Sequence, residues 1–344
     1  MSEIFALPLS EADKLEELDL SNLSVGKLPD SIAEFQGLKR LFLDKAELVS
    51  LPETIGQLQE LEELHLDQNN LTKLPSSLRQ LQGLKRLSLR SNQMSDVPES
   101  LWGLEKLEKL SIGDNPISRV SEGIGELSSL KELFIDTLKL VSVPDSIGKL
   151  SELHTLDLGH NELASLPESL GDLSNLSGFL YLSNNQLSAL PKSLGQLHKA
   201  RYLNFTDNQL TTFPEFIGEM ENLRELRVYN NSFSSLPESL GGLKKLNELH
   251  AMNNQLASLP DAIGELGNLT QLDLRNNKLT ELSNSISNLQ KLVHLDLRGN
   301  ELRAIPESVL ELANLQKLDL RWNKLRSIPT WLGKLEKRRV TVYL

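Results

Sequence analysis

Leucines recur along the chain at a fixed spacing, and polar residues fill most positions between them. From Leu15 the order is Leu-x-x-Leu-x-Leu-x-x-Asn-x-Leu-x-x-Leu-Pro-x-x-Ile/Leu-Gly-x-Leu-x-x, a 23-residue period that occupies residues 15–337. These 323 positions hold fourteen periods and one inserted residue, near Leu176-Ser177-Gly178. The Leu-x-Leu piece of each period alternates as a β-strand does, with its leucines on one side. The pattern therefore predicts fourteen short strands.

A single period is too short to bury its own leucines, so neighbouring periods must stack and share one core. Consecutive strands then pair in parallel, about 4.8 Å apart, along an inner wall. After the Leu-Pro step, segments such as 168–173 predict one or two helical or 3-10 turns on an outer wall. The sequence predicts an α/β solenoid, a horseshoe with a parallel β-sheet on its concave face and short helical or 3-10 turns on its convex face.

The ninth position of the period is asparagine in eleven of the fourteen periods. A buried amide supplies both donors and acceptors to turn backbones that otherwise lie unsatisfied. We therefore expect a column of buried asparagines. Leu23, Ala46 and Leu138 replace the asparagine in three periods, and Ser121 and Ser283 replace the proline in two.

The same period sets the expected domain organisation. Residues 15–337 form one repeat domain, residues 1–14 a shortened half-repeat or cap, and residues 338–344 a closing strand. Neither end shows an obvious polar cap helix. The basic residues near the C-terminus, Arg338 among them, are expected to form a solvated end.

The period and its consensus resemble the leucine-rich-repeat family, and the resemblance covers more than nine tenths of the chain. The 23-residue form with Leu-Pro-x-Ser-Ile-Gly-x-Leu resembles the intracellular class, which includes plant Ras-group proteins, Ras-pathway scaffolds and bacterial effectors. The resemblance implies protein–protein recognition, often in signalling. It also implies a cytoplasmic location, or delivery into a host cytosol if the protein is a bacterial effector.

The amino-acid composition argues against several kinds of site and partner. The chain has 344 residues, 78 of them leucine, no cysteine and a net charge of −11. Without cysteine there is no disulfide framework, Cys-ligated zinc or thiol nucleophile. The acidic balance argues against nucleic acid or an anionic membrane as the main partner, and no run approaches the roughly 20 apolar residues of a membrane span.

Motifs for catalysis are not evident. The six histidines are scattered and none has His-Glu-x-x-His spacing. Gly123-Ile124-Gly125 lacks the rest of any nucleotide motif. We therefore expect no catalytic residue, no metal and no cofactor, and hence a protein that is not an enzyme.

Partner specificity is expected at the third, fifth and seventh positions of each period, which point outward from the strands. One stretch of these columns is aromatic, and it holds three of the four tyrosines of the chain. Its residues are Phe179, Tyr181, Tyr202, Arg227, Tyr229, His250 and Met252. Exposed aromatics beside arginine are typical of binding hot spots, so we favour contact with a protein partner. The alternative is that the rings cover the strands and stack on one another without a partner.

The last repeats carry a charged strip as a second candidate surface. It consists of Asp273, Arg275, Asp296, Arg298, Asp319, Arg321 and Trp322. Stacking places an acidic column beside a basic one, so we favour a ladder of mutual ion pairs over a charged docking strip. Exposed pairs of this kind contribute only about 0–1 kcal/mol each.

The first functional hypothesis is a non-catalytic, monomeric scaffold that binds another protein on its concave face. An alternative is the substrate-recognition part of a larger enzyme or secreted bacterial effector, of ubiquitin-ligase type, whose catalytic domain is not in this chain. A third hypothesis is self-association through exposed end strands.

Overall fold

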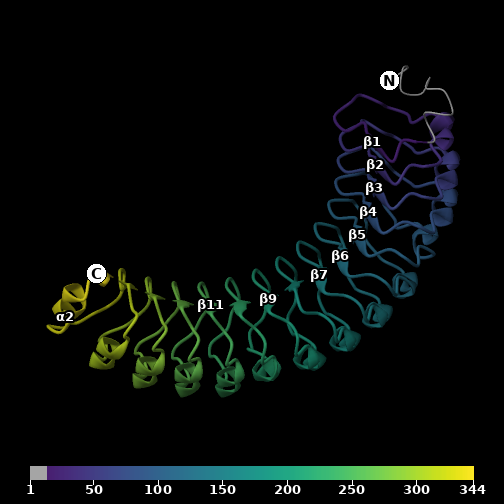
Figure 1. The fold of residues 1–344 in the computed structure, drawn as a ribbon. Coiled ribbons are helices and arrows are strands. Elements are labelled where there is room, and N and C mark those ends of the chain that lie inside the picture. The colour runs from purple at the N-terminus through teal and green to yellow at the C-terminus, as the bar shows by residue number, and fades with distance from the viewer. Residues whose placement is uncertain (1–13) are drawn as a thin grey trace. The chain divides into compact units, whose positions relative to one another are not determined.

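The computed structural model describes residues 14–344. The chain divides into two compact units between Leu163 and Ala164, here called unit 1 and unit 2 (Figure 1). The half-repeat expected at residues 1–14 lies, except for Lys14, outside the described residues. The prediction that residues 15–337 form one domain stays a prediction.

Unit 1 consists of short strands that alternate with 3-10 helices. Its strands are β1 (Glu17–Asp19), β2 (Arg40–Phe42), β3 (Glu63–His65), β4 (Arg86–Ser88), β5 (Lys109–Ser111), β6 (Glu132–Phe134) and β7 (Thr155–Asp157). Its 3-10 helices are η2 (Asp30–Glu34), η3 (Glu53–Gln57), η4 (Ser76–Gln80), η5 (Glu99–Leu101), η6 (Glu122–Glu126) and η7 (Asp145–Lys149).

Unit 2 also consists of strands that alternate with 3-10 helices, but it ends with an α-helix and a strand. Its strands are β8 (Phe179–Tyr181), β9 (Tyr202–Asn204), β10 (Glu225–Arg227), β11 (Glu248–His250), β12 (Gln271–Asp273), β13 (His294–Asp296), β14 (Lys317–Asp319) and β15 (Thr341–Tyr343). Its 3-10 helices are η8 (Glu168–Asp172), η9 (Lys192–Gln196), η10 (Glu215–Glu219), η11 (Glu238–Gly242), η12 (Asp261–Glu265), η13 (Asn284–Asn288) and η14 (Glu307–Glu311). The α-helix α2 (Leu332–Lys337) precedes β15.

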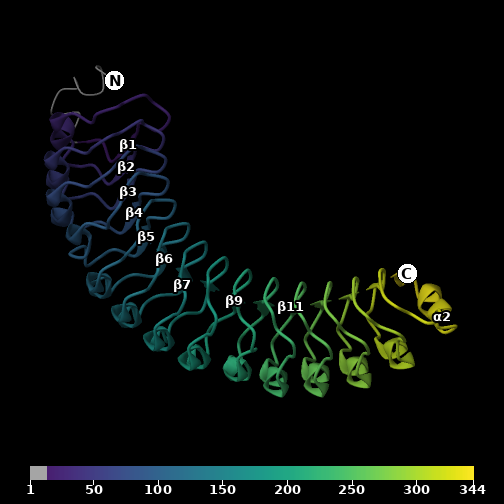
Figure 2. The same ribbon diagram turned by 180° about the vertical axis from the view of Figure 1, so that it is seen from behind.

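Within each unit the strands pair in parallel, and the register advances by one period. Leu18 lies opposite Leu41 in unit 1, and Leu226 lies opposite Leu249 in unit 2. In each unit the strands line one side and the 3-10 helices line the other, as Figures 1 and 2 show from opposite directions. The predicted solenoid of parallel strands and 3-10 turns is confirmed. We call the outward side of the strands the strand face.

The core of each unit is a stack of leucines. The central leucine of each strand from β1 to β14 is buried, with Leu64 and Leu249 both at 0% exposure. Leucines of the turn side, such as Leu81 and Leu266, are also at 0%. Each repeat thus buries its apolar residues against its neighbours.

The predicted asparagine column is confirmed, and Asn254 shows its bonding. Its Nδ2 donates to the carbonyl oxygens of Val228, Ala251 and Met252 at 3.1–3.2 Å, and its Oδ1 accepts the N–H of Phe233 at 3.1 Å. One amide therefore satisfies backbone groups of its own turn and of the preceding repeat, which no leucine could do.

Two departures from the consensus, Ser121 and Gly123, both contact the same buried side chain, Trp102. The Trp102 ring lies where a side chain on Gly123 would otherwise be, because a Cβ there would stand 2.2 Å from the ring. The Trp102 Nε1–H donates to Ser121 Oγ at 2.9 Å, at the position where other repeats have proline. Gly123 of the Gly123-Ile124-Gly125 segment thus leaves space for the buried Trp102 indole.

The C-terminal end contains an α-helix that the sequence analysis did not predict, whereas its basic residues Lys334, Lys337, Arg338 and Arg339 are exposed, as expected. Helix α2 buries Leu332 and Leu335, and β15 pairs with β14. Arg338 donates to the carbonyl oxygens that follow η14, including that of Leu312 at 2.6 Å. These hydrogen bonds join the segment after α2 to the turn of the preceding repeat. None of the helices described within residues 14–344 has the length and apolarity needed to cross a bilayer.

Candidate functional site

Four adjacent strands of unit 2 position the aromatic patch. Most of its members are the first or third residue of strands β8 to β11, which face outward because the central leucine faces the core, and Tyr229 and Met252 follow two residues after β10 and β11. Phe179 lies opposite Tyr202, and Tyr181 lies opposite Asn204. Arg227 lies opposite His250 one strand pair further on. The 23-residue period therefore places these residues on neighbouring strands.

Three rings form a compact cluster on β8 and β9. The ring centroids of Phe179 and Tyr181 are 5.7 Å apart and nearly parallel. Tyr202 packs against both, at centroid distances of 5.2 and 5.0 Å. These separations lie within the range of favourable aromatic pairs. We call these three residues the ring cluster.

The members of the ring cluster differ sharply in exposure. Phe179 is 46% exposed, whereas Tyr202 is only 8% exposed. The Arg227 guanidinium lies 5.8 Å from the Tyr202 ring centroid and helps to cover it. Burial raises the pKa of Tyr202 to about 12. The expectation that Tyr202 is an exposed contact residue is wrong, because its neighbours cover it, and the stacking foreseen by the alternative hypothesis is present.

The remaining predicted patch residues lie around this cluster. Tyr229 is half-buried on the strand face, and within the described chain no ring contact joins it to the ring cluster. Met252 accepts a contact from Arg275 Nη2 at 3.1 Å from its Sδ. His250 is nearly buried, with Nε2 3.0 Å from Glu248 Oε2. The exposed part of the patch is therefore centred on Phe179.

One group of described residues could hold a metal ion. The ligand atoms of Glu225, Glu248 and His250 lie within 4.8 Å of one another. However, Arg227 Nε already lies 2.5 Å from a Glu225 carboxylate oxygen. A cation would have to displace this arginine. The spacing of the histidines in the sequence gave no indication of this group, because it forms only across paired strands.

The charged strip is a ladder of mutual ion pairs. In each repeat the arginine bonds the aspartate two residues before it, at 2.6 Å for Asp273 and Arg275, 2.7 Å for Asp296 and Arg298, and 2.7 Å for Asp319 and Arg321. Cross-strand contacts of 3.7 and 3.4 Å link successive repeats. The favoured prediction, a self-paired ladder, agrees with this geometry, and little charge is left for a docking strip.

Two aromatic rings lie beside Arg321, the last arginine of the ladder. Arg321 lies 5.6 Å from the Trp322 ring centroid and 4.9 Å from that of Tyr343. Trp322 is 73% exposed. Tyr343 was not among the predicted residues, because its place beside Arg321 depends on the pairing of β15 with β14.

Unit 1 contains a charged bridge that the sequence analysis missed. Arg90 bonds Asp136 in a bidentate manner, at 2.6 and 2.8 Å, across the intervening repeat. A Cβ on Gly113, which lies between them, would stand 2.6 Å from Arg90 Nη1. The sequence did contain an indication of this bridge. In the seventh column Arg90 and Asp136 have opposite charges and lie on either side of Gly113.

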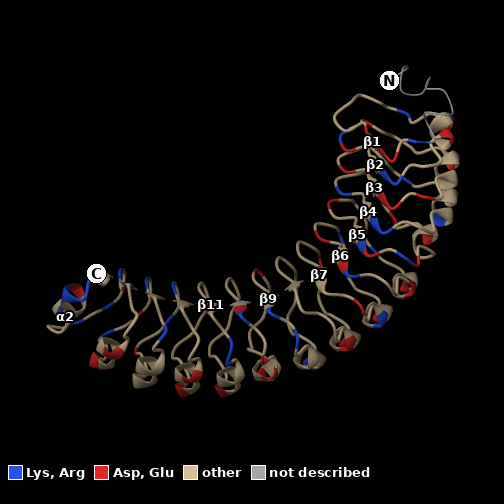
Figure 3. Ribbon diagram, in the orientation of Figure 1, with Lys and Arg blue, Asp and Glu red and all other residues tan. Residues whose placement is uncertain are grey.

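Charge elsewhere is mixed. Figure 3 shows Lys and Arg interspersed with Asp and Glu along the strands and turns of each unit. The predicted absence of nucleic-acid and membrane partners stays a prediction.

Comparisons with known proteins agree with this architecture. A family model described as "Leucine-rich repeat region" matches residues 179–276. A second, "Leucine rich repeat", matches residues 59–117, 252–302 and 267–325, and a third matches residues 152–173. A comparison with curated proteins gave no match.

Solved structures give the family. A leucine-rich-repeat protein of Leptospira interrogans is 31% identical, with a TM-score of 0.84, over 98% of this chain and 97% of that one. The chain therefore belongs to the leucine-rich-repeat family. The intracellular class expected from the 23-residue period stays a prediction.

Plant receptors are also similar. The plant peptide hormone receptor RGFR1, solved in complex with RGF2, is 30% identical with a TM-score of 0.77, over 95% of this chain and 59% of that one. The Arabidopsis receptor kinase HAESA, solved with the peptide hormone IDA and the co-receptor SERK1, is 27% identical with a TM-score of 0.74, over 96% of this chain and 57% of that one. This chain thus matches a little over half of either receptor chain.

Proposed function

We propose that the protein is a non-catalytic binding module that holds a protein partner on the strand face of unit 2. The observation that carries the proposal is the exposed Phe179 ring standing on a stacked base of Tyr181 and Tyr202. Leucine-rich-repeat proteins commonly act as interaction scaffolds, and the partner contact would be centred on this ring.

The geometry supports a hot spot. A large apolar ring that is half exposed and packs against two other rings loses less conformational freedom than a free side chain when a partner covers it. Arg227 at the edge of the cluster supplies the polar border that hot spots usually have. Tyr229 adds an amphipathic ring two strands away.

The comparisons support a protein as the ligand. RGFR1 and HAESA are each seen with a peptide hormone, and HAESA also with a co-receptor. The fold alone does not specify a partner. The chemistry of the patch favours a partner that offers an apolar side chain to Phe179 and a hydrogen-bond acceptor to Arg227.

The test is affinity purification from the native host with the full chain and with Phe179→Ser plus Tyr229→Ala. Both residues are accessible, whereas Tyr202 supports the cluster and should be left intact. We expect partner recovery to fall at least tenfold, because losing a hot-spot side chain typically costs about 2 kcal/mol.

The matched control is Phe42→Ala, a half-buried ring on the strand face of unit 1. It should leave recovery unchanged. Equal recovery of the same partner by the double variant and the original chain, with unchanged thermal unfolding, would overturn the proposal.

A further inference from the structure

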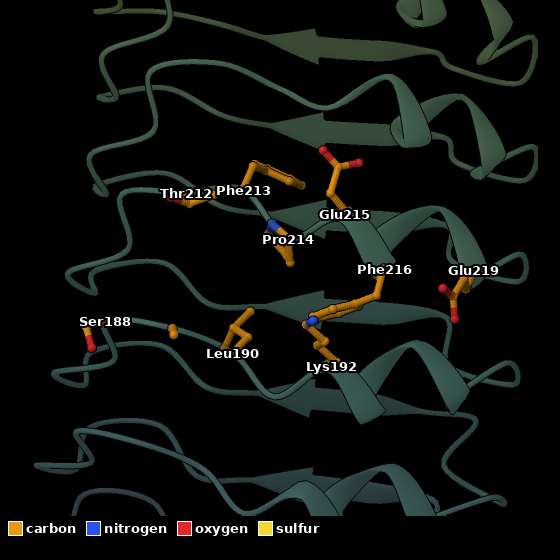
Figure 4. Close-up of a pocket in the computed structure, with 10 residues that line it drawn as sticks. Ser188, Leu190, Lys192, Thr212, Phe213, Pro214, Glu215, Phe216 and Glu219 are labelled. Atoms are coloured by element: carbon orange, nitrogen blue, oxygen red, sulfur yellow. The ribbon is translucent and has the colours of Figure 1, made fainter.

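Hollows recur on the turn side of unit 2, so they do not distinguish one repeat from another. Figure 4 shows a hollow of about 560 Å³ beside η9 and η10, with Phe213 and Phe216 in its lining. Another, of about 590 Å³, lies beside the first residues of η11, η12 and η13. The strand face of unit 2, in contrast, carries a pair of opposed glutamates that occurs once among the paired strands of residues 14–344.

The two opposed glutamates are Glu225 and Glu248. They are the first residues of β10 and β11 and lie directly opposite each other. On their other sides lie Tyr202 of β9 and Gln271 of β12, which carry no positive charge. Like charges directly opposite each other destabilise a strand pair. This arrangement therefore favours a cation between the two carboxylates.

Other acidic residues of the strand face already have such a cation. Each glutamate that begins a strand in unit 1 lies opposite a basic residue, in the pairs Glu17–Arg40, Glu63–Arg40, Glu63–Arg86 and Glu132–Lys109. The opposed aspartates of the charged strip each bond an arginine of their own repeat. Glu248 differs from all of these, because within the described chain its one ion-pair partner is His250.

His250 places a nitrogen ligand beside the two carboxylates. Its Nε2 lies 3.0 Å from Glu248 Oε2, and its side chain is 11% exposed. The ligand atoms of Glu225, Glu248 and His250 all lie within 4.8 Å of one another. Ligands that bind a tetrahedral ion at about 2.1 Å lie roughly 3.4 Å apart. Small side-chain rotations therefore bring the three ligand atoms to the separation that a metal ion needs.

The Arg227 guanidinium is the group that a metal ion must replace. Its Nε bonds Glu225 Oε1 at 2.5 Å, and its side chain is 38% exposed. An ion pair as exposed as this contributes at most about a fivefold factor, whereas a metal ion bonds three ligands at once. After release from Glu225, Arg227 still has the Tyr202 ring, whose centroid lies 5.8 Å from the guanidinium.

We propose that Glu225, Glu248 and His250 bind a divalent transition-metal ion such as Zn²⁺. Zinc accepts imidazole nitrogen and carboxylate oxygen together, whereas Mg²⁺ and Ca²⁺ prefer oxygen ligands alone. Three protein ligands leave a fourth position, which water can fill because the Glu248 side chain is 39% exposed. The two carboxylates then share one cation, which removes their repulsion. The metal site does not depend on the proposed partner contact.

The experiment is isothermal titration of the full chain with Zn²⁺, after treatment with EDTA and exchange into a buffer that does not bind metals. We expect one ion per chain, and excess Mg²⁺ should not displace it. His250→Ala and Glu225→Gln should each weaken zinc binding at least tenfold, because each removes one of three ligands. Circular dichroism checks that each variant is folded.

Two further variants test the geometry of the site. Arg227→Gln removes the competing guanidinium and should strengthen zinc binding about two- to fivefold. His65→Ala is the matched control, because Glu63 and His65 repeat the Glu-Leu-His order of β11 but have Arg40 and Arg86 opposite the glutamate. This variant should bind zinc as the original chain does.

The proposal is overturned if Zn²⁺ does not bind, if His250→Ala binds it as the original chain does, or if His65→Ala weakens binding to the same extent. Equal or weaker binding by Arg227→Gln would also overturn it, because the ion would then not take the place of the guanidinium. Phe179→Ser should leave zinc binding unchanged, so failure of this site and failure of the proposed partner contact are distinguishable.

Discussion

At the scale of single residues, the buried amide of the asparagine column is the most demanding requirement of the fold. Asn69 shows this where the preceding repeat has Ala46 in place of asparagine. The Asn69 Oδ1 accepts the backbone N–H of both Ala46 and Leu48, at 3.0 and 2.9 Å. The Leu48 bond recurs in repeats that keep their asparagine, so the bond to Ala46 is the additional one that the following repeat makes to the turn without its own amide.

Asp157 is the residue whose charge opposes folding most clearly. Burial raises its pKa from 3.8 to about 6, although its carboxylate accepts the Gly159 N–H at 2.9 Å. The nearby charges are those of Asp136, Arg90 and His160. Because the folded state binds the proton more tightly than the unfolded state, ionised Asp157 destabilises the fold above about pH 6, and this penalty disappears as the pH falls toward 4.

We therefore predict that Asp157→Asn unfolds at higher urea than the original chain at pH 7. The gain should be about 1–2 kcal/mol after allowance for solvent screening, and it should vanish near pH 4. Urea unfolding followed by circular dichroism between pH 4 and 8 measures this. Asp145→Asn, an exposed carboxylate on η7, controls for the loss of one charge. A difference that stays constant over this range would contradict the prediction.

At the scale of elements, two 3-10 turns begin with serine in place of the consensus proline, and each serine hydroxyl bonds a side chain of the preceding repeat. Ser283 replaces proline before η13, and its Oγ accepts the Ser285 N–H at 3.1 Å and donates to Asp261 at 2.6 Å. Ser121 replaces proline before η6 and accepts the Trp102 indole N–H. In both cases a hydroxyl supplies hydrogen bonds in place of the rigidity that proline gives.

The end of unit 2 depends on one element contact that the repeat does not contain. Arg338 donates to the carbonyl oxygens of Leu310, Leu312 and Ala313, at 2.6–3.1 Å. We predict that Arg338→Ala lowers the free energy of unfolding by about 1 kcal/mol, because exposed and partly buried carbonyl oxygens lose charge-assisted hydrogen bonds. Amide hydrogen exchange in β15 should rise first, since this end strand has one neighbour.

Lys337→Ala is the matched control, since this residue is also basic and exposed at the end of α2. It should leave exchange in β15 unchanged. If both variants raise exchange in β15 equally, the effect belongs to the helix and not to the Arg338 hydrogen bonds.

At the scale of the whole molecule, each repeat within a unit contacts mainly the repeats before and after it. Stability is then the sum of repeat and interface contributions. Removal of one complete period from unit 2, residues 269–291, joins Asn268 to Leu292 and preserves the register. We predict that this deletion folds cooperatively with reduced stability, as measured by circular dichroism during urea unfolding.

Removal of twelve residues, 269–280, is the control. It places outward positions of one repeat against core positions of the next, so the leucine stack is interrupted. This variant should lose cooperative unfolding. Equal loss of cooperativity in the 23-residue deletion would show that the repeats do not act as interchangeable units.

The sequence determined the period, the parallel strands, the 3-10 turns and the asparagine column. These follow from leucine spacing and from the need to satisfy buried backbone groups, both of which are local and repeat in every turn. The sequence also placed Phe179, Tyr181 and Tyr202 on neighbouring strands, because a fixed period converts a separation of 23 residues into contact.

Only the tertiary structure decided which of these side chains remain accessible. Exposure depends on the directions that neighbouring side chains take, so Tyr202 is covered although its column faces outward. The Glu225, Glu248 and His250 cluster and the Arg90–Asp136 bridge arise from contacts across repeats.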